Sequence, residues 1–237
     1  MGYILSIKRN SCGKEVELIE PNLYVDCFSD IELLKKKTFW NVLVKYFLQK
    51  YIPVDSIVLD VGSGYCEFIN IVSAREKFAV DLNINARNFV NQDVKLIETT
   101  AEKITYIQDA YVDVVFCSNF FEHLNDRESL LRVLKEIKRI LKDNGRFIII
   151  QPNIKYAYRV YWDYYDHNIP LSDVSMGEAL RISGFDIKEI YPKFLPLSPK
   201  GFSVKLVFLL IIYLRCKLLW KLFGKQMFIV ASKKLSP

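Results

Sequence analysis

A glycine-spaced turn that follows an apolar strand has the clearest capacity for chemistry in this sequence. Residues 57–61 are apolar except for Asp60, which is typical of a strand buried on both faces of a parallel sheet. Gly62 and Gly64 permit a tight turn and the close approach of a ligand to the backbone. Residues 65–73 are predicted to form a helix whose first amides face that ligand. The pattern predicts a nucleoside cofactor at the carboxyl end of the strand.

The residue types at the turn exclude two of the three cofactor classes that use such a turn. A phosphate-binding loop of the GxxxxGK[ST] type needs a lysine and a hydroxyl residue that this turn lacks. The dinucleotide fingerprint needs a third glycine where Glu67 stands, and a carboxylate there would repel a phosphate. Asp60, two residues before Gly62, instead suits a cofactor with a cationic amino-acid end and no phosphate.

Several segments resemble the motifs of class I S-adenosylmethionine-dependent methyltransferases. Residues 60–66, Asp-Val-Gly-Ser-Gly-Tyr-Cys, are similar to the first motif of that family, with a cysteine in place of the third glycine. A second strand, 78–82, carries Asp81 at the position where the family binds the ribose hydroxyls. Residues 95–102 and 112–119 resemble the third motif and the fourth strand. The order and spacing of these segments carry the resemblance.

The resemblance implies an α/β fold and S-adenosylmethionine as the cofactor. The expected sheet is Rossmann-like and mostly parallel, with an antiparallel last strand and flanking helices. A Rossmann-like domain that binds a nucleoside without catalysis is the alternative. The implied cofactor-binding residues are Asp60, Gly62, Ser63, Gly64, Tyr65, Asp81, Leu82, Thr100, Ala101 and Asn119. Thr100 stands where the family commonly has an acid for the adenine amino group, and Cys66 departs from the third glycine.

The two histidines of the chain are the candidates for a general base. Methyl transfer to a hydroxyl benefits from a group that removes the proton as the new bond forms. We predict His123 as that base with Glu122 orienting it, and His167 as its substitute or as an acceptor ligand. A structural role for His123 is the alternative. The three residues could also ligate a divalent metal, but Asn119 replaces the acid often seen before such a Glu-His pair, so no metal is predicted.

Length and composition predict one domain over residues 1–237, because 51% of the residues are hydrophobic and can form a sizeable core. Five scattered cysteines without CxxC spacing indicate reduced thiols, and no secretory signal is evident, so a cytoplasmic location is expected. The expected parts are a cover segment and helix (1–50), a cofactor-binding core (51–151), an acceptor region (152–191), an insertion (192–226), and the last strand and tail (227–237).

The insertion before the last strand is both apolar and basic. No acid follows Glu189, whereas nine Lys or Arg residues do. Removing these nine from the total of 33 leaves 24 bases against 27 acids, so residues 1–189 have a net charge of −3. Residues 206–214 form an unbroken apolar run, shorter than the roughly 20 residues that span a bilayer. We predict that 203–224 docks on an anionic membrane surface, with Trp220 at headgroup level. A buried lid and a dimer contact are the alternatives, and nucleic-acid binding is not favoured.

Aromatic residues and carboxylates gather in the expected acceptor region, in a composition that suits the apolar faces and hydroxyl edges of a sugar. Ordinary packing at a sheet edge would produce much of the same composition. The whole chain resembles methyltransferases of bacterial cell-surface polysaccharide and glycolipid biosynthesis, which implies O-methylation of a sugar or lipid-linked saccharide at the inner face of the membrane. A small-metabolite O- or N-methyltransferase and a catalytically silent cofactor-binding partner are the alternatives. The predicted acceptor ligands are Asn153, Tyr156, Tyr161, Trp162 and Asp166.

Overall fold

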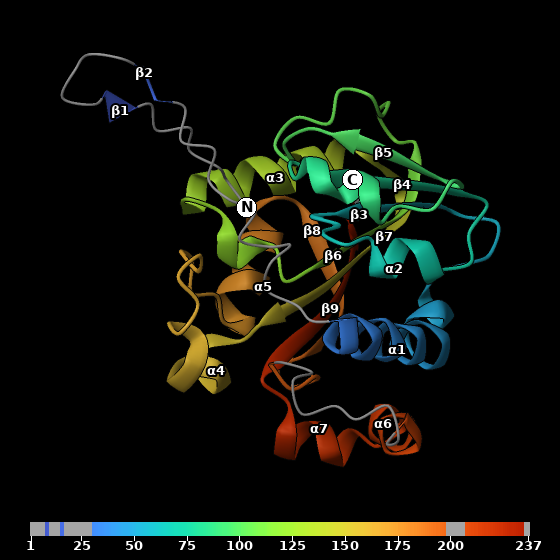
Figure 1. Cartoon of the computed structure of the whole chain (residues 1–237), viewed down its shortest axis with the longest axis vertical. Helices are drawn as coiled ribbons and strands as arrows, with labels where there is room; N and C mark the ends of the chain where they lie inside the picture. The colour runs from blue at the N-terminus through green and yellow to red at the C-terminus, as the bar shows by residue number, and fades with distance from the viewer. Residues whose placement is uncertain (1–7, 10–14, 17–29, 198–206, 235–237) are drawn as a thin grey trace.

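A seven-stranded sheet forms the centre of the computed structural model, which describes residues 8–9, 15–16, 30–197 and 207–234 (Figure 1). The strand order is β5-β4-β3-β6-β7-β9-β8. Strands β3 to β7 run parallel to one another, and β9 runs antiparallel to both β7 and β8. The strands are β3 (Ile57–Val61), β4 (Glu76–Asp81), β5 (Val94–Glu98), β6 (Val112–Ser118), β7 (Leu141–Pro152), β8 (Phe185–Tyr191) and β9 (Gln226–Lys233); β1 (Lys8–Arg9) pairs separately with β2 (Glu15–Val16). The expected Rossmann-like sheet with an antiparallel last strand is confirmed.

Strand β3 lies in the middle of the sheet and positions the glycine turn. All five of its residues are buried, which explains why its sequence is almost continuously apolar. Its two neighbours are β4 on one side and β6 on the other. The order in which successive strands are added therefore changes direction at β3. Ligands of open α/β sheets bind in the crevice at such a point, beyond the carboxyl ends of the strands.

Helices cover both faces of the sheet (Figure 1). One core cluster joins the sheet to α3 (Arg127–Ile140) and α5 (Asp173–Ile182). The other cluster joins it to α1 (Asp30–Tyr46), α2 (Glu67–Ile71), α6 (Val207–Arg215) and α7 (Lys217–Phe223). The remaining helix is α4 (Ile154–Tyr161), and short 3-10 turns are η1 (Leu48–Tyr51), η2 (Ile84–Asn88) and η3 (Phe121–His123).

Two helices are shorter than the sequence pattern predicts. The helix after the glycine turn begins only at Glu67, because Cys66 adopts a left-handed conformation with φ of 60° and extends the turn. Helix α3 ends at Ile140, before the Asn144-Gly145 pair whose residue types are typical of a helix end, because Leu141 already pairs with Val112 of β6. The first difference is local, whereas the second arises from a contact with a distant part of the chain.

The insertion between β8 and β9 is partly core and partly surface. Leu210 and Leu214 of α6 and Trp220 of α7 are buried in the cluster with α1, and the Trp220 ring lies 4.9 Å from Phe194 and 5.5 Å from Phe47 between centroids. Residues 203–206 of the segment predicted to bind membrane lie outside the described residues, as does most of the predicted cover segment before residue 30. Within the described part of the chain, no helix is long and apolar enough to cross a bilayer.

Replacing the buried tryptophan tests whether the insertion is an integral part of the fold. Trp220→Ala should lower the free energy of unfolding by about 3 to 5 kcal/mol, because it leaves a large cavity beside α1. Leu222→Ala, on the exposed side of the same helix, should change it by less than about 0.5 kcal/mol. Urea denaturation followed by circular dichroism measures both, and equal effects would contradict the observed packing.

Candidate active site

The glycine turn is fixed to the end of β4 by three hydrogen bonds that its backbone amides donate. The amides of Gly62 and Ser63 donate to the carbonyl of Val80 at 2.9 and 3.2 Å, and the Gly64 amide donates to Oδ2 of Asp81 at 2.7 Å. Gly62 and Gly64 have φ angles of 70° and 52°, in the left-handed region that favours glycine. The turn is therefore positioned before any ligand arrives.

Two cavities flank this turn and meet at Gly62, Gly64 and Asn119. The larger, of about 460 Å³, is called here the donor cavity because it contains Asp60. The smaller, of about 190 Å³, is called the nucleoside cavity because it contains Asp81. Each of the ten residues predicted to bind the cofactor lines one cavity or both: Asp60, Ser63 and Tyr65 the donor cavity, Asp81, Leu82, Thr100 and Ala101 the nucleoside cavity, and Gly62, Gly64 and Asn119 both. The structure thus brings the predicted set together around one turn.

The donor cavity contains a buried carboxyl group. Asp60 is 3% exposed, and its burial, reinforced by the nearby carboxylates of Glu67 and Asp81, raises the pKa of Asp60 well above its ordinary value. Glu67 itself pairs with Lys36 at 2.7 Å. A cation placed beside Asp60 would offset both the burial and the repulsion, because an opposite charge favours the ionised carboxylate. The cavity is suited to the cationic end of a ligand.

Asp81 is oriented toward the nucleoside cavity by the backbone. Its Oδ2 accepts the hydrogen bond from Gly64, and its Oδ1 accepts one from the amide of Asn83 at 2.8 Å. Thr100 accepts a hydrogen bond from the amide of Glu102, so its hydroxyl stabilises the local turn at the position where an acid was expected. Asp81 is therefore the carboxylate of this cavity best placed for a pair of sugar hydroxyls.

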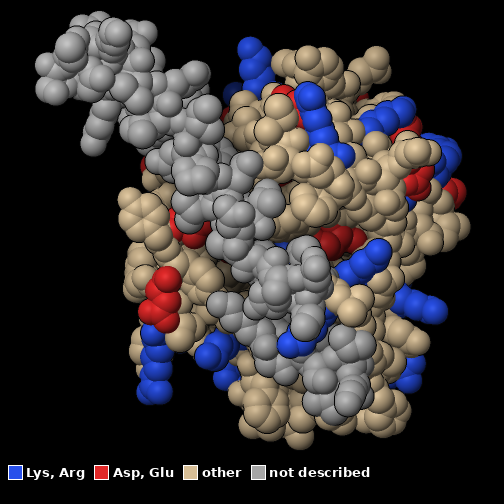
Figure 2. All heavy atoms as spheres, in the orientation of Figure 1, with Lys and Arg blue, Asp and Glu red and all other residues tan. Residues whose placement is uncertain are grey.

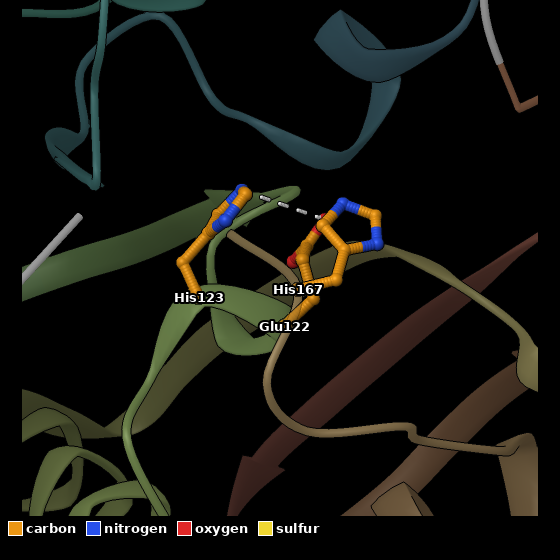
Figure 3. A group of neighbouring side chains, drawn as sticks. All are labelled: Glu122, His123 and His167. Atoms are coloured by element: carbon orange, nitrogen blue, oxygen red, sulfur yellow. Dashed lines mark ion pairs between the residues drawn. The ribbon is translucent and has the colours of Figure 1, made fainter. Parts of the chain in front are cut away.

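A second polar group surrounds His123, at the turn η3 after β6 (Figure 3). The His123 Nδ1 lies 3.1 Å from a carboxylate oxygen of Asp166, and its Nε2 lies 4.0 Å from Oε1 of Glu122. Glu122 is buried and its Oε2 accepts a hydrogen bond from Gln151 at 2.7 Å. Burial alone would lower the pKa of His123, but Asp166 and Glu122 together raise it. Both carboxylates therefore favour the protonated imidazole.

His167 packs against His123, but its pKa is shifted in the opposite direction. Its ring is 5.2 Å from that of His123 and stacks on Tyr164 at 4.8 Å. Burial, followed by the neighbouring His123, lowers the pKa of His167, and its Nδ1 is buried without a hydrogen-bond partner. The lowered pKa favours the neutral imidazole of His167, and its Nδ1 has no hydrogen-bond partner within the described residues; a neutral imidazole nitrogen can bind a metal or accept a proton.

The group of Glu122, His123 and His167 has a composition that can hold a divalent cation. One potential ligand atom from each residue lies within 4.8 Å of the others (Figure 3). Two of the three also have protein partners, because Glu122 binds Gln151 and His123 binds Asp166. Of the three, His123 lines the nucleoside cavity, whereas Glu122 and His167 line neither the donor cavity nor the nucleoside cavity. The absence of a metal stays a prediction.

Most of the predicted acceptor ligands have structural contacts instead. Asn153 is fully buried, caps α4 and donates to Asp173 and the Pro192 carbonyl, both at 2.9 Å. Tyr161 is also fully buried, and its hydroxyl donates to the Ile169 carbonyl. Tyr156 contacts Lys193, and Trp162 is exposed, but neither lines the donor cavity or the nucleoside cavity. The acceptor role of these four residues stays a prediction that this arrangement does not support. Asp166 differs from them, because it contacts His123.

Several residues of the donor cavity were not anticipated from the sequence. Phe39 and Trp40 of α1 and Leu209, Leu210 and Tyr213 of α6 line its apolar part. Trp40 also packs in the core, where its ring lies 6.1 Å from that of Phe116 between centroids. These residues approach the turn because α6 packs on α1. The periodicity of the sequence does not reveal such packing.

Comparisons with known proteins agree with this geometry. Residues 59–149 match the family profile described as a methyltransferase domain. A crystal structure described as a SAM-dependent methyltransferase from Archaeoglobus fulgidus is 25% identical and superposes with a TM-score of 0.59, covering 86% of this chain and 100% of that one. An uncharacterised protein of Methanocaldococcus jannaschii is 31% identical over 114 residues, covering 48% of this chain and 47% of that protein. The sarcosine/dimethylglycine N-methyltransferase of Halorhodospira halochloris is 28% identical over 117 residues, covering 44% and 40%. The chain thus spans less than half the length of these two relatives.

The fold, the acid-lined glycine turn and the matched domain define a class I methyltransferase domain. The chain contains such a domain, and its cofactor is S-adenosylmethionine. The amino-acid end of this cofactor carries a sulfonium and an ammonium group, which suit the buried carboxyl group of Asp60, and its ribose suits Asp81 in the nucleoside cavity.

Alanine substitutions at the two glycines test the geometry of the turn. An added Cβ at Gly64 meets open space, so Gly64→Ala should cost only the strain of the left-handed conformation, about 1 to 2 kcal/mol. An added Cβ at Gly62 would lie 2.4 Å from the Phe120 ring, so Gly62→Ala should cost more and should regain part of that cost when combined with Phe120→Ala. Thermal unfolding of the four variants, Phe120→Ala alone included, checks this order; Gly64→Ala as the more harmful change would contradict it.

The raised pKa of Asp60 predicts a pH-dependent penalty in the ligand-free protein. A carboxyl group whose folded pKa is raised stabilises the fold at low pH and loses that contribution as the pH rises through the folded pKa. Asp60→Asn removes this titration, so the variant should become progressively more stable than the unsubstituted protein as the pH rises, while its affinity for S-adenosylmethionine falls by at least about tenfold, the equivalent of one lost charged contact. Melting temperatures over a pH series and calorimetry measure the two effects. Parallel melting curves at all pH values would contradict the assignment.

Proposed function

We propose that the chain transfers the methyl group of S-adenosylmethionine to a hydroxyl oxygen of a sugar or a lipid-linked saccharide in surface polysaccharide synthesis. The observation that carries the proposal is the shape of the donor cavity. It begins at the acid-lined turn and continues into an apolar wall made by α1, α6 and residues 195–197. A purely polar small acceptor has no use for that wall, whereas an acceptor with an apolar carrier would fill it.

The proposed chemistry is an in-line displacement. Bound S-adenosylmethionine supplies an electrophilic methyl group, whose bond to sulfur breaks with the electron pair on sulfur as the bond to the acceptor oxygen forms. The chain contributes by holding the two reactants in line and excluding water, which can supply much of the rate enhancement. Asn119, at the meeting point of the two cavities and with φ of 49°, belongs to the strained backbone that shapes this junction.

His123 is the proposed acceptor of the hydroxyl proton. It follows β6 at the edge of the nucleoside cavity, and its protonated form is stabilised by Asp166 and Glu122. The same stabilisation means that the neutral form, which alone can take a proton, is populated only above the raised pKa of His123. His167 is adjacent, and its lowered pKa favours the neutral form, so it is the group that can replace His123.

A second candidate function is methylation of a small amine or hydroxyl metabolite. The match to the relative named sarcosine/dimethylglycine N-methyltransferase favours it, since that name describes a small acceptor. A catalytically silent cofactor-binding partner is the third alternative, favoured by Cys66 and Thr100 at positions where the family has other residues. The three candidates differ in which acceptor receives the methyl group: a sugar or glycolipid, a small metabolite, or none.

The test is transfer of isotopically labelled methyl from S-adenosylmethionine. Purified protein would be incubated with a bacterial glycolipid extract, with the water-soluble sugars released from it, and with sarcosine. Label in the glycolipid fraction, lost on His123→Ala and His167→Ala together, is the expected result. Label in sarcosine alone would establish the second candidate, and no label with retained cofactor binding would establish the silent partner; either outcome would remove the proposal.

The pH dependence of the rate tests the role of His123 separately. Activity should rise with pH through the raised pKa of His123, because deprotonation produces the base. Asp166→Asn removes the hydrogen-bonded carboxylate that contributes to raising this pKa, so the rise should move to lower pH. An unchanged profile in Asp166→Asn would show that another group accepts the proton.

A further inference from the structure

We propose that the outer face of α6 and α7 docks on an anionic lipid bilayer and opens the donor cavity toward it, so that the acceptor enters from the membrane. The proposal depends on the proposed function for the nature of the acceptor, but the docking itself does not. The outer face is defined here by six exposed apolar residues, Phe208, Leu209, Ile212, Leu218, Leu222 and Phe223.

Helix α6 is apolar on the side that faces solvent as well as on the side that faces the core. Leu210 and Leu214 are buried, yet the six residues of the outer face are between 40% and 71% exposed. A surface helix of a globular protein normally carries polar residues on its outward side, and a contiguous apolar patch on two successive helices marks a surface that binds something apolar. Water is therefore an unfavourable environment for this face.

Charge identifies the kind of apolar partner. Arg215, Lys217 and Lys221 are exposed on the same two helices, and the sequence has no acid after Glu189. In Figure 2 the described atoms at the lower end of the molecule, where Figure 1 places α6 and α7, are mostly tan and blue. Cations interleaved with aliphatic residues suit an anionic headgroup layer above acyl chains. A second copy of the same face would bring like charges together, so self-association is less favoured.

The face lies at the mouth of the donor cavity. Leu209 belongs to both, because it is 54% exposed and also lines the cavity. The same cavity is also lined by Leu210 and Tyr213 and, at the glycine turn, by Gly62 and Asn119. An acceptor anchored in the bilayer by an apolar chain could therefore present its polar end to the methyl donor without leaving the membrane.

The two helices are held firmly enough to carry such a face. The Trp220 Nε1 donates to the Tyr213 carbonyl at 2.7 Å, the Tyr213 hydroxyl donates to the carbonyl of Phe194, and Lys193 Nζ donates to the carbonyl of Lys221 at 2.8 Å. None of these bonds involves a side chain of the outer face. Substitutions on the outer face should therefore leave the fold intact.

The test compares two matched pairs of substitutions. Leu218→Ser with Leu222→Ser alters the outer face, where both residues are 64% exposed. Val174→Ser with Ile182→Ser alters equally exposed residues, 62% and 69%, on α5 across the sheet. Cosedimentation would use vesicles of phosphatidylcholine alone or mixed with phosphatidylglycerol, and calorimetry with S-adenosylhomocysteine would be run on every variant.

The intact protein and the α5 pair should bind the phosphatidylglycerol vesicles, whereas the α7 pair should bind at least about tenfold more weakly, as expected when two apolar side chains no longer insert. Lack of vesicle binding by the intact protein, or unchanged binding by the α7 pair, would overturn the proposal. So would a concentration-dependent dimer in analytical ultracentrifugation that the α7 pair abolishes. If the protein binds S-adenosylhomocysteine but not vesicles, the docking proposal is wrong and the cofactor assignment still holds.

Discussion

The buried carboxylate of Asp60 is the feature on which the rest of the site depends. A carboxylate is costly to bury without a partner, and this one lies near two other acids, Glu67 and Asp81. The fold places it there because β3 is an interior strand and every residue of β3 is buried. The glycine turn follows at once, fixed by hydrogen bonds to β4. Burying Asp60 therefore lowers the stability of the ligand-free fold, and the bound cationic cofactor offsets this cost.

The cofactor half of the protein could be predicted from the sequence because its signals are local. A strand buried on both faces is recognisable from its composition, and Gly62 and Gly64 are needed wherever the backbone takes positive φ. The later strands are recognisable in the same way, so the order of motifs defined the sheet. The structure then gathered all ten expected cofactor residues around the two cavities.

The acceptor half could not be predicted to the same degree, because its signals are tertiary. Asn153 and Tyr161 have side chains that suit a sugar, yet both are buried and bind the backbone or other side chains of the fold. The left-handed conformation of Cys66, which shortens α2, has no composition signal since cysteine rarely adopts it. The insertion was recognised as apolar and basic, but only the packing of α6 on α1 places it beside the donor cavity.

The most direct test of the account is whether cofactor binding ionises Asp60. Calorimetric titration with S-adenosylmethionine, repeated in buffers of different ionisation enthalpy over a pH series, measures the protons released on binding. The account predicts proton release, because the cationic end of the cofactor lowers a pKa that burial had raised. Tight binding with the same enthalpy in every buffer would mean that Asp60 is not the partner of the cation, and absence of binding would contradict the cofactor site itself.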